Sequence, residues 1–265
     1  MARAVVLGVT AVFLGLFLFV PLAAIFGEAL RRGWGVYWAA VTDPAALAAV
    51  RLTLVAVAVA VPLNLVFGLA AAWVVARHRF PGRSVLVTLI DLPLAVSPVV
   101  TGLMYMLVFG LQGWFGRWFW DRGIEVVFAV PGIVLATVFV TLPFVARELI
   151  PLLEEQGDEE EQAARLLGAS GWQMFWRVTL PNVRWALLYG VILSVARAMG
   201  EFGAVSVVSG HIRGRTTTAP LHIEILYNEY NFAGAFAVAT LLALTALGTL
   251  AARSVLEWRT RETAE

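Results

Sequence analysis

Two opposite charges stand four residues apart inside an otherwise apolar stretch of this chain. Arg197 and Glu201 are the only charged residues between positions 185 and 210. Residues at this spacing share one face of a helix, and an unpaired charge inside a membrane is costly, so each can neutralise the other. The pattern predicts an internal ion pair or, alternatively, a pathway on which Arg197 offers positive charge to an oxyanion. Gly203 and Ser206 follow closely and are candidates to line that pathway.

A second set of anion-binding side chains lies in the segment from Ser209 to Pro220. It holds Arg213, Arg215 and three successive threonines. Guanidinium and hydroxyl groups are hydrogen-bond donors that suit a tetrahedral oxyanion. The segment is predicted to guide an anion on the outer side of the membrane or, alternatively, to be a docking or structural loop, because outer loops commonly hold protein partners.

The residue types that the chain lacks exclude several kinds of chemistry. The 19 basic residues are all arginine, no cysteine is present, and the three histidines are scattered. A P-loop ATPase and a Schiff-base enzyme both need a lysine, and thiolate or zinc chemistry needs cysteine or clustered histidine. The net charge of +1 does not favour nucleic acid as a partner. We expect no catalytic site, no metal site and no cofactor bound by this chain.

The composition places these residues in a membrane. Of the 265 residues, 60% are hydrophobic and only 14% are charged. A helix needs about 20 apolar residues to cross a bilayer. Long intervals between charges therefore predict an all-α membrane protein with six spans in a single transmembrane domain, residues 1–265. The predicted spans are residues 4–27, 52–76, 85–111, 126–146, 185–210 and 230–252.

The arginines predict the direction of these spans. An even number of spans puts both termini on one side of the membrane. Eleven arginines then fall on the side of the termini, seven fall on the other side, and Arg197 lies within the membrane. Cytoplasmic loops carry the excess of basic residues, so both termini are predicted to be cytoplasmic. Asp91, the one charge in the third span, is predicted to be an interfacial or inter-helix hydrogen-bond partner.

The longest cytoplasmic connection, residues 147–183, has the pattern of a helix-turn-helix elbow. Seven acidic residues precede Ala163, and negative charge favours a helix N-terminus. Gly168 and Gly171 are predicted to break this helix, and Pro181 is predicted to end a second short one. Such a turn is small enough to enter a groove on another protein. A solvated amphipathic loop lying on the bilayer is the alternative.

The same loop resembles the EAA motif of ABC importer permeases, by which such subunits dock on separate ATPases. The resemblance rests on Ala163-Ala164, Gly168 and the run from Val178 to Pro181, whose spacing matches the motif; Gln162 replaces its usual glutamate and Val178 its isoleucine. The coupling residues that this resemblance implies are Gln162, Ala163, Ala164, Gly168, Ala169, Ser170, Leu180 and Pro181.

A wider resemblance covers most of the chain from about Leu52 onward. The run from Arg184 to Phe232 and the stretch from Pro93 to Gly102 are similar to permeases of bacterial sulfate/thiosulfate ABC importers, specifically to the second of their two paired permeases. The sequence GEFGA at 200–204 is shared with molybdate-type permeases. Molybdate or tungstate is therefore an alternative substrate.

The resemblance implies a six-helix type I ABC importer permease in the bacterial cytoplasmic (inner) membrane, surrounded by lipid. Its implied partners are ATPase subunits, which bind the ATP, a second and related permease, and a periplasmic or extracellular sulfate-binding protein. A proton- or sodium-coupled secondary carrier, with Asp91, Arg197 and Glu201 as its relay, is the alternative from another class.

Overall fold

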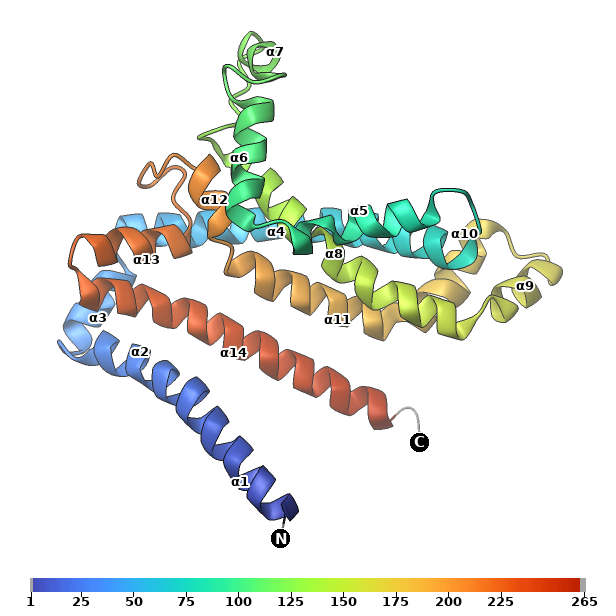
Figure 1. The fold of residues 1–265 in the computed structure, drawn as a ribbon, viewed down its shortest axis with the longest axis horizontal. Coiled ribbons are helices and arrows are strands. Elements are labelled where there is room, and N and C mark those ends of the chain that lie inside the picture. Colours follow the sequence, from blue (N-terminus) through green and yellow to red (C-terminus); the bar gives the residue numbers. More distant parts are fainter. Residues whose placement is uncertain (1, 263–265) are drawn as a thin grey trace.

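The computed structural model describes residues 2–262 as a bundle of long helices with shorter helices around it (Figure 1). This part of the chain contains helices and no strands. The single-domain prediction also included Met1 and residues 263–265, which lie outside the described residues. Five helices are long and apolar enough to cross a membrane, and a bent pair of helices makes a sixth when the pair is counted as one span. The prediction of an all-α membrane protein with six spans is confirmed.

The first two spans are longer than predicted. The first consists of α1 (Ala2–Leu14), a π-helical turn (Gly15–Phe19) and α2 (Val20–Leu30). After α3 (Trp34–Val41), α4 (Pro44–Arg77) forms the second span and begins before the predicted start at residue 52. The reason is a helix cap: Oδ1 of Asp43 accepts hydrogen bonds from the backbone of Ala45 at 2.8 Å and of Ala46 at 3.2 Å.

The third predicted span, residues 85–111, is not one continuous helix. It consists of α5 (Arg83–Ala95) and α6 (Pro98–Phe109), which are bent by 109° relative to each other. Val96 and Ser97 between them are extended, with ψ of 132° and 135°. Proline disfavours a helical conformation in the residue before it, which explains the break at Ser97. In Figure 1, α6 and α7 (Gly116–Trp120) project away from the bundle.

The remaining helices shift the predicted limits of the fourth and fifth spans. The fourth span, α8 (Val130–Gln156), continues past its predicted end at residue 146. The fifth runs from Gly171 to Met199 rather than over residues 185–210. Its parts are α10 (Gly171–Met174), a π-helical turn (Phe175–Thr179) and α11 (Leu180–Met199). The other elements are α9 (Glu159–Leu166), α12 (Gly203–Val208), α13 (Ala219–Asn228) and α14 (Phe232–Glu262), which forms the sixth span.

Both π-helical turns end two residues before a proline, Pro21 in the first span and Pro181 in the fifth. The N–H groups of Val20 and Leu180 bond to the carbonyls of Gly15 and Phe175, five residues back. Proline has no N–H to donate and its ring crowds the preceding turn. A local π adjustment accommodates the ring inside a membrane helix. The prediction that Pro181 ends a helix is therefore wrong, because the helix runs through it.

The core lies where α4 packs against α8 and α11. Buried side chains of these helices include Val57, Ile133 and Leu149. α4 and α8 approach so closely at Gly68 that a Cβ there would lie 2.8 Å from Cβ of Val145. In contrast, the first span, Val5–Leu30, has no buried residue in its apolar window. α2 and α14 lie side by side and run in opposite directions (Figure 1), so α1 begins and α14 ends away from α3.

Candidate functional site

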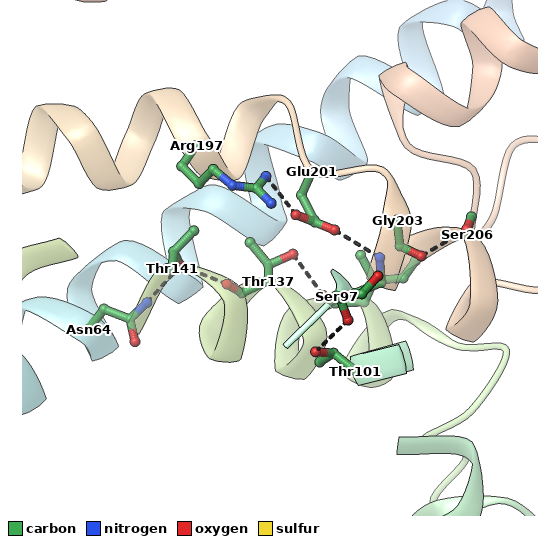
Figure 2. A network of polar contacts seen from close by, with 11 residues as sticks. Asn64, Ser97, Thr101, Thr137, Thr141, Arg197, Glu201, Gly203 and Ser206 are labelled. Atoms are coloured by element: carbon green, nitrogen blue, oxygen red, sulfur yellow. Dashed lines mark hydrogen bonds and ion pairs between the residues drawn. The ribbon is translucent and has the colours of Figure 1, made fainter. Parts of the chain in front are cut away.

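The ion pair predicted within the membrane is present (Figure 2). Nη1 of Arg197 lies 2.7 Å from Oε2 of Glu201, and the Glu201 side chain is 1% exposed against 33% for Arg197. The two residues do not share one face of a helix as predicted, because α11 ends at Met199. Oε1 of Glu201 also accepts a hydrogen bond from the N–H of Ala204 at 2.9 Å, at the start of α12. One carboxylate thus joins the end of α11 to the beginning of α12.

The break between α11 and α12 packs against the break between α5 and α6. A Cβ on Gly203 would lie 2.9 Å from Cβ of Pro98, and a Cβ on Gly102 would lie 2.6 Å from Cβ of Val207. This contact therefore needs glycine at both positions. Two interrupted helices meet beside the Arg197–Glu201 pair (Figure 2). Irregular backbone at this depth is tolerated only where protein or a water-filled cavity covers it.

Ser206, the other predicted residue of the pathway, is bonded within its own helix. Its Oγ donates a hydrogen bond to the carbonyl of Gly203 at 2.9 Å. Its own carbonyl lies 3.0 Å from Nε2 of His211. The hydroxyl therefore satisfies an acceptor at the first turn of α12, directly after the ion pair.

A string of polar side chains between α4 and α8, visible in Figure 2, was missed by the sequence reasoning. Nδ2 of Asn64, a fully buried residue, donates to Oγ1 of Thr141 at 2.7 Å and to the carbonyl of Val138 at 3.0 Å. Oγ1 of Thr141 donates to the carbonyl of Thr137 at 2.6 Å. The available signal was Asn64 itself, the one side-chain amide in the charge-free second span. These bonds fix α4 against α8 at a point where both are buried.

The segment between α12 and α13 holds its arginines outside and its threonines inside. Arg213 forms an ion pair with Glu229, the residue after α13, and its hydrogen bond lowers the pKa of Glu229. Arg215 is exposed. The three threonines at 216–218 are at most 4% exposed, so their hydroxyls do not reach the surface of this chain. Of the predicted donors, the two arginines reach the surface.

The predicted elbow is present, but it is shorter than residues 147–183. α8 continues to Gln156 and the next membrane helix starts at Gly171, which leaves α9 and the turn after it. Gly168 has a φ of +87°, a left-handed conformation that favours glycine. Ser170 begins the next helix with a capping box: its Oγ accepts from the N–H of Gln173, and its N–H donates to Oε1 of Gln173.

The tip of this elbow is apolar and exposed. Leu166 and Leu167 are 90% and 89% exposed, and no atom lies within 4 Å of the place that a Cβ on Gly168 would take. Of the other coupling residues implied by the resemblance, Gln162, Ala163, Ser170 and Pro181 are exposed, and Ala164, Ala169 and Leu180 are half-buried. An exposed apolar tip on a polar helix is typical of a surface that docks on another protein.

Asp91 lies in an ion pair between α5 and α8. Its Oδ1 is 3.5 Å from Nε of Arg147, and both side chains are partly exposed. Asp91 therefore contacts a neighbouring helix, as predicted, through an ion pair. The residues suggested as a proton relay are held in two separate ion pairs, Asp91 with Arg147 and Arg197 with Glu201.

Comparison with known proteins gives a consistent result over nearly the whole chain. A family described as "Binding-protein-dependent transport system inner membrane component" matches residues 64–261. The chain is 54% identical over 248 residues to the sulfate transport system permease protein CysW of Synechocystis sp., covering 94% of this chain and 90% of that protein. It is 39% identical over 253 residues to the sulfate transport system permease protein CysT of Escherichia coli (strain K12), covering 96% of this chain and 91% of that protein.

A solved structure shares the fold. A chain of a bacterial alginate ABC transporter, crystallised in complex with a periplasmic protein that carries an alginate pentasaccharide, superposes with a TM-score of 0.80 at 14% sequence identity. The match covers 98% of this chain and 94% of that chain. The likeness shows that the two chains share their fold.

Proposed function

This chain belongs to the family of binding-protein-dependent transport system inner membrane components, and we propose that it is the permease subunit of an ATP-driven importer that carries sulfate or thiosulfate into the cytoplasm. The observation that carries the proposal is the 54% identity, over more than nine tenths of the chain, to permeases named for sulfate transport. The second permease of the importer would be a related chain, since the CysT permeases are similar to this one as well.

An energy source outside this chain is part of the proposal. Moving a dianion inward against about 100 mV, inside negative, costs about 4.6 kcal/mol before any concentration gradient. A chain without lysine has no P-loop lysine to bind ATP. ATP is instead bound and hydrolysed by separate ATPase subunits, and this chain has no catalytic role. The exposed tip formed by Leu166, Leu167 and Gly168 enters a groove on the ATPase.

The proposed orientation follows from this docking. With α9 in the cytoplasm, both termini are cytoplasmic, and Arg213 and Arg215 face the periplasmic or extracellular binding protein. Closure of the ATPases on ATP moves the elbows and rocks the helices between inward- and outward-facing states. The anion then passes along the interrupted helices, where Arg197 holds positive charge next to Glu201.

Reconstitution tests the proposal. This chain, the ATPase, the second permease and the binding protein are placed in liposomes, with ATP inside and radiolabelled sulfate outside together with the binding protein. We expect uptake that requires both ATP and the binding protein and that unlabelled thiosulfate competes away. If molybdate competes with the labelled sulfate and thiosulfate does not, the substrate would be reassigned to molybdate. Uptake that persists without ATP and collapses with an uncoupler would instead indicate a secondary carrier.

A further inference from the structure

The coupling helix α9 is attached to the rest of the protein through one buried side chain. Of its eight residues, Glu159 to Leu166, Glu161 is the buried one, and it is a carboxylate rather than an apolar residue. Its neighbour Gln162, which occupies the position of the motif's glutamate, is exposed. A force applied to the exposed face of α9 therefore reaches the spans through the chain at either end, through the contacts of Glu161, and through an exposed hydrogen bond that Asn182 of α11 donates to Glu160.

The Glu161 carboxylate is held by two different membrane helices. Nε and Nη2 of Arg77, the last residue of α4, lie 3.1 Å and 3.4 Å from its two oxygens. This forked geometry fixes direction as well as distance. Oγ1 of Thr179, in the π-helical turn of the fifth span, donates to Oε1 at 2.8 Å. The side chains of Arg77 and Glu161 are 9% and 7% exposed, and Thr179 is 2% exposed.

A third helix joins the same junction through Arg77. Its Nη1 donates to the carbonyl of Leu153, in the last turns of α8. Glu161 thus contacts α4 and the fifth span directly, and α8 through the guanidinium. The other ion pair in this region, Arg83 with Glu154, has side chains that are 41% and 44% exposed. Such an exposed pair is screened by water and holds its helices weakly.

We propose that Glu161 is a positioning residue that transmits the movement of the coupling helix to α4, α8 and the fifth span. The inference rests on the proposed function, because it assumes that an ATPase moves α9. A buried charge that loses its partner is strongly destabilising, so the junction stays closed while the helices around it move. When the ATPase shifts α9, Glu161 carries α4 and the fifth span with it, and those two helices hold Asn64 and Arg197.

The test measures how much sulfate is carried per ATP hydrolysed in the reconstituted full complex. Glu161→Gln keeps the size of the side chain and removes the charge. Glu159→Gln is the matched control, because it makes the same change at an exposed position of the same helix. We expect Glu161→Gln to assemble and hydrolyse ATP while sulfate per ATP falls roughly 2- to 30-fold, the range for residues that couple two sites. The control keeps the wild-type ratio.

Two further measurements separate the possible outcomes. If Glu161→Gln fails to co-purify with its partners, Thr179→Val becomes the test variant. It removes the hydroxyl that donates to the Glu161 carboxylate and leaves the ion pair with Arg77 in place, so a smaller fall in sulfate carried per ATP is expected. A wild-type ratio in Glu161→Gln, or in Thr179→Val where that variant decides, overturns the inference. If the wild-type complex carries no sulfate, the proposed substrate fails, and the same ratio is measured with molybdate, so the two ideas are judged separately.

Discussion

Removing either member of the Arg197–Glu201 pair should harm the protein by different amounts. Glu201 is 1% exposed, and without Arg197 its carboxylate would keep one hydrogen bond, from the backbone of Ala204. Leaving a buried charge unpaired costs about 3–5 kcal/mol. Arg197 is 33% exposed and can turn toward water, so Glu201→Ala should cost less, about 1–3 kcal/mol for the charge-assisted bonds that are lost. The double variant leaves no charge, and it should recover about 1–3 kcal/mol relative to the sum of the single losses.

Thermal unfolding of the purified complex, followed by tryptophan fluorescence, measures these differences. A loss of 1 kcal/mol lowers the unfolding temperature of a chain of this size by about 2–4 °C, so Arg197→Ala should lower it by roughly 6–20 °C. Arg184→Ala is the control, because it removes an exposed arginine whose guanidinium lies 5.0 Å from the Trp185 ring and should cost no more than about 1 kcal/mol. Strictly additive losses in the double variant would refute the reasoning.

Sulfate uptake by the same variants separates a structural pair from a residue that serves the anion. If the pair is structural, uptake follows stability, and the double variant transports better than Arg197→Ala. If Arg197 serves the anion directly, Glu201→Ala is mild and the double variant is no better than Arg197→Ala. The helix rule that makes arginine before glutamate the weaker order does not apply here, because Glu201 lies beyond the end of α11.

Three further predictions concern the surface. In sealed cells, an impermeant thiol reagent should label a single cysteine that replaces Arg215 and should not label one that replaces Arg79. Labelling at position 79 would show that the proposed orientation is reversed. Gly168→Asp should reduce co-purification of the ATPase more than Gly168→Asn, which tolerates the same left-handed backbone without adding charge; equal effects would count against docking through the tip. The Arg213 hydrogen bond lowers the pKa of Glu229 below its ordinary value of 4.5. The ion pair therefore contributes fully to stability above pH 4.5, and this contribution is lost as the pH falls through the lowered pKa of Glu229. Thermal unfolding measured from pH 6 to pH 3 should show this loss in the wild type, and Glu229→Gln should lack it.

The third span shows what hydropathy can and cannot predict. An apolar run with one charge predicted a span over residues 85–111, where the structure has two apolar helices, α5 and α6. Hydropathy depends on the side chains alone and carries no information about the direction of the backbone, so it could not predict the 109° bend. The signal for the bend was Pro98, which forces Ser97 into an extended conformation. Pro181 does not interrupt its span, because the preceding π-helical turn accommodates it.

The coupling site, α9 and the turn after it, was predicted only in part, because sequence patterns do not show which side chains are buried by tertiary packing. The acidic run before Ala163 correctly indicated a helix, and Gly168 correctly indicated the turn. Six of the seven acidic residues before Ala163 are exposed or half-buried, whereas Glu161 is buried against Arg77, and the charge pattern alone does not distinguish it. The distinction arises from tertiary packing, because Arg77 and Glu161 are 84 residues apart in the sequence.

The segment that contains the π-helical turn Phe175–Thr179 connects the docking tip to the fifth span, and its length sets the direction of the tip. Nine residues separate Gly168 from Val178, and part of this spacer has the wider winding of five-residue hydrogen bonding. Deleting one residue of α10, ahead of this turn, would rotate everything before it by about 100° about the helix axis and draw it in by about 1.5 Å. Leu167 would then point away from its present direction even if every remaining side chain were unchanged. The direction of the docking tip therefore depends on the number of residues in the helix that follows it, and an insertion or deletion in α10 should abolish docking more completely than most substitutions.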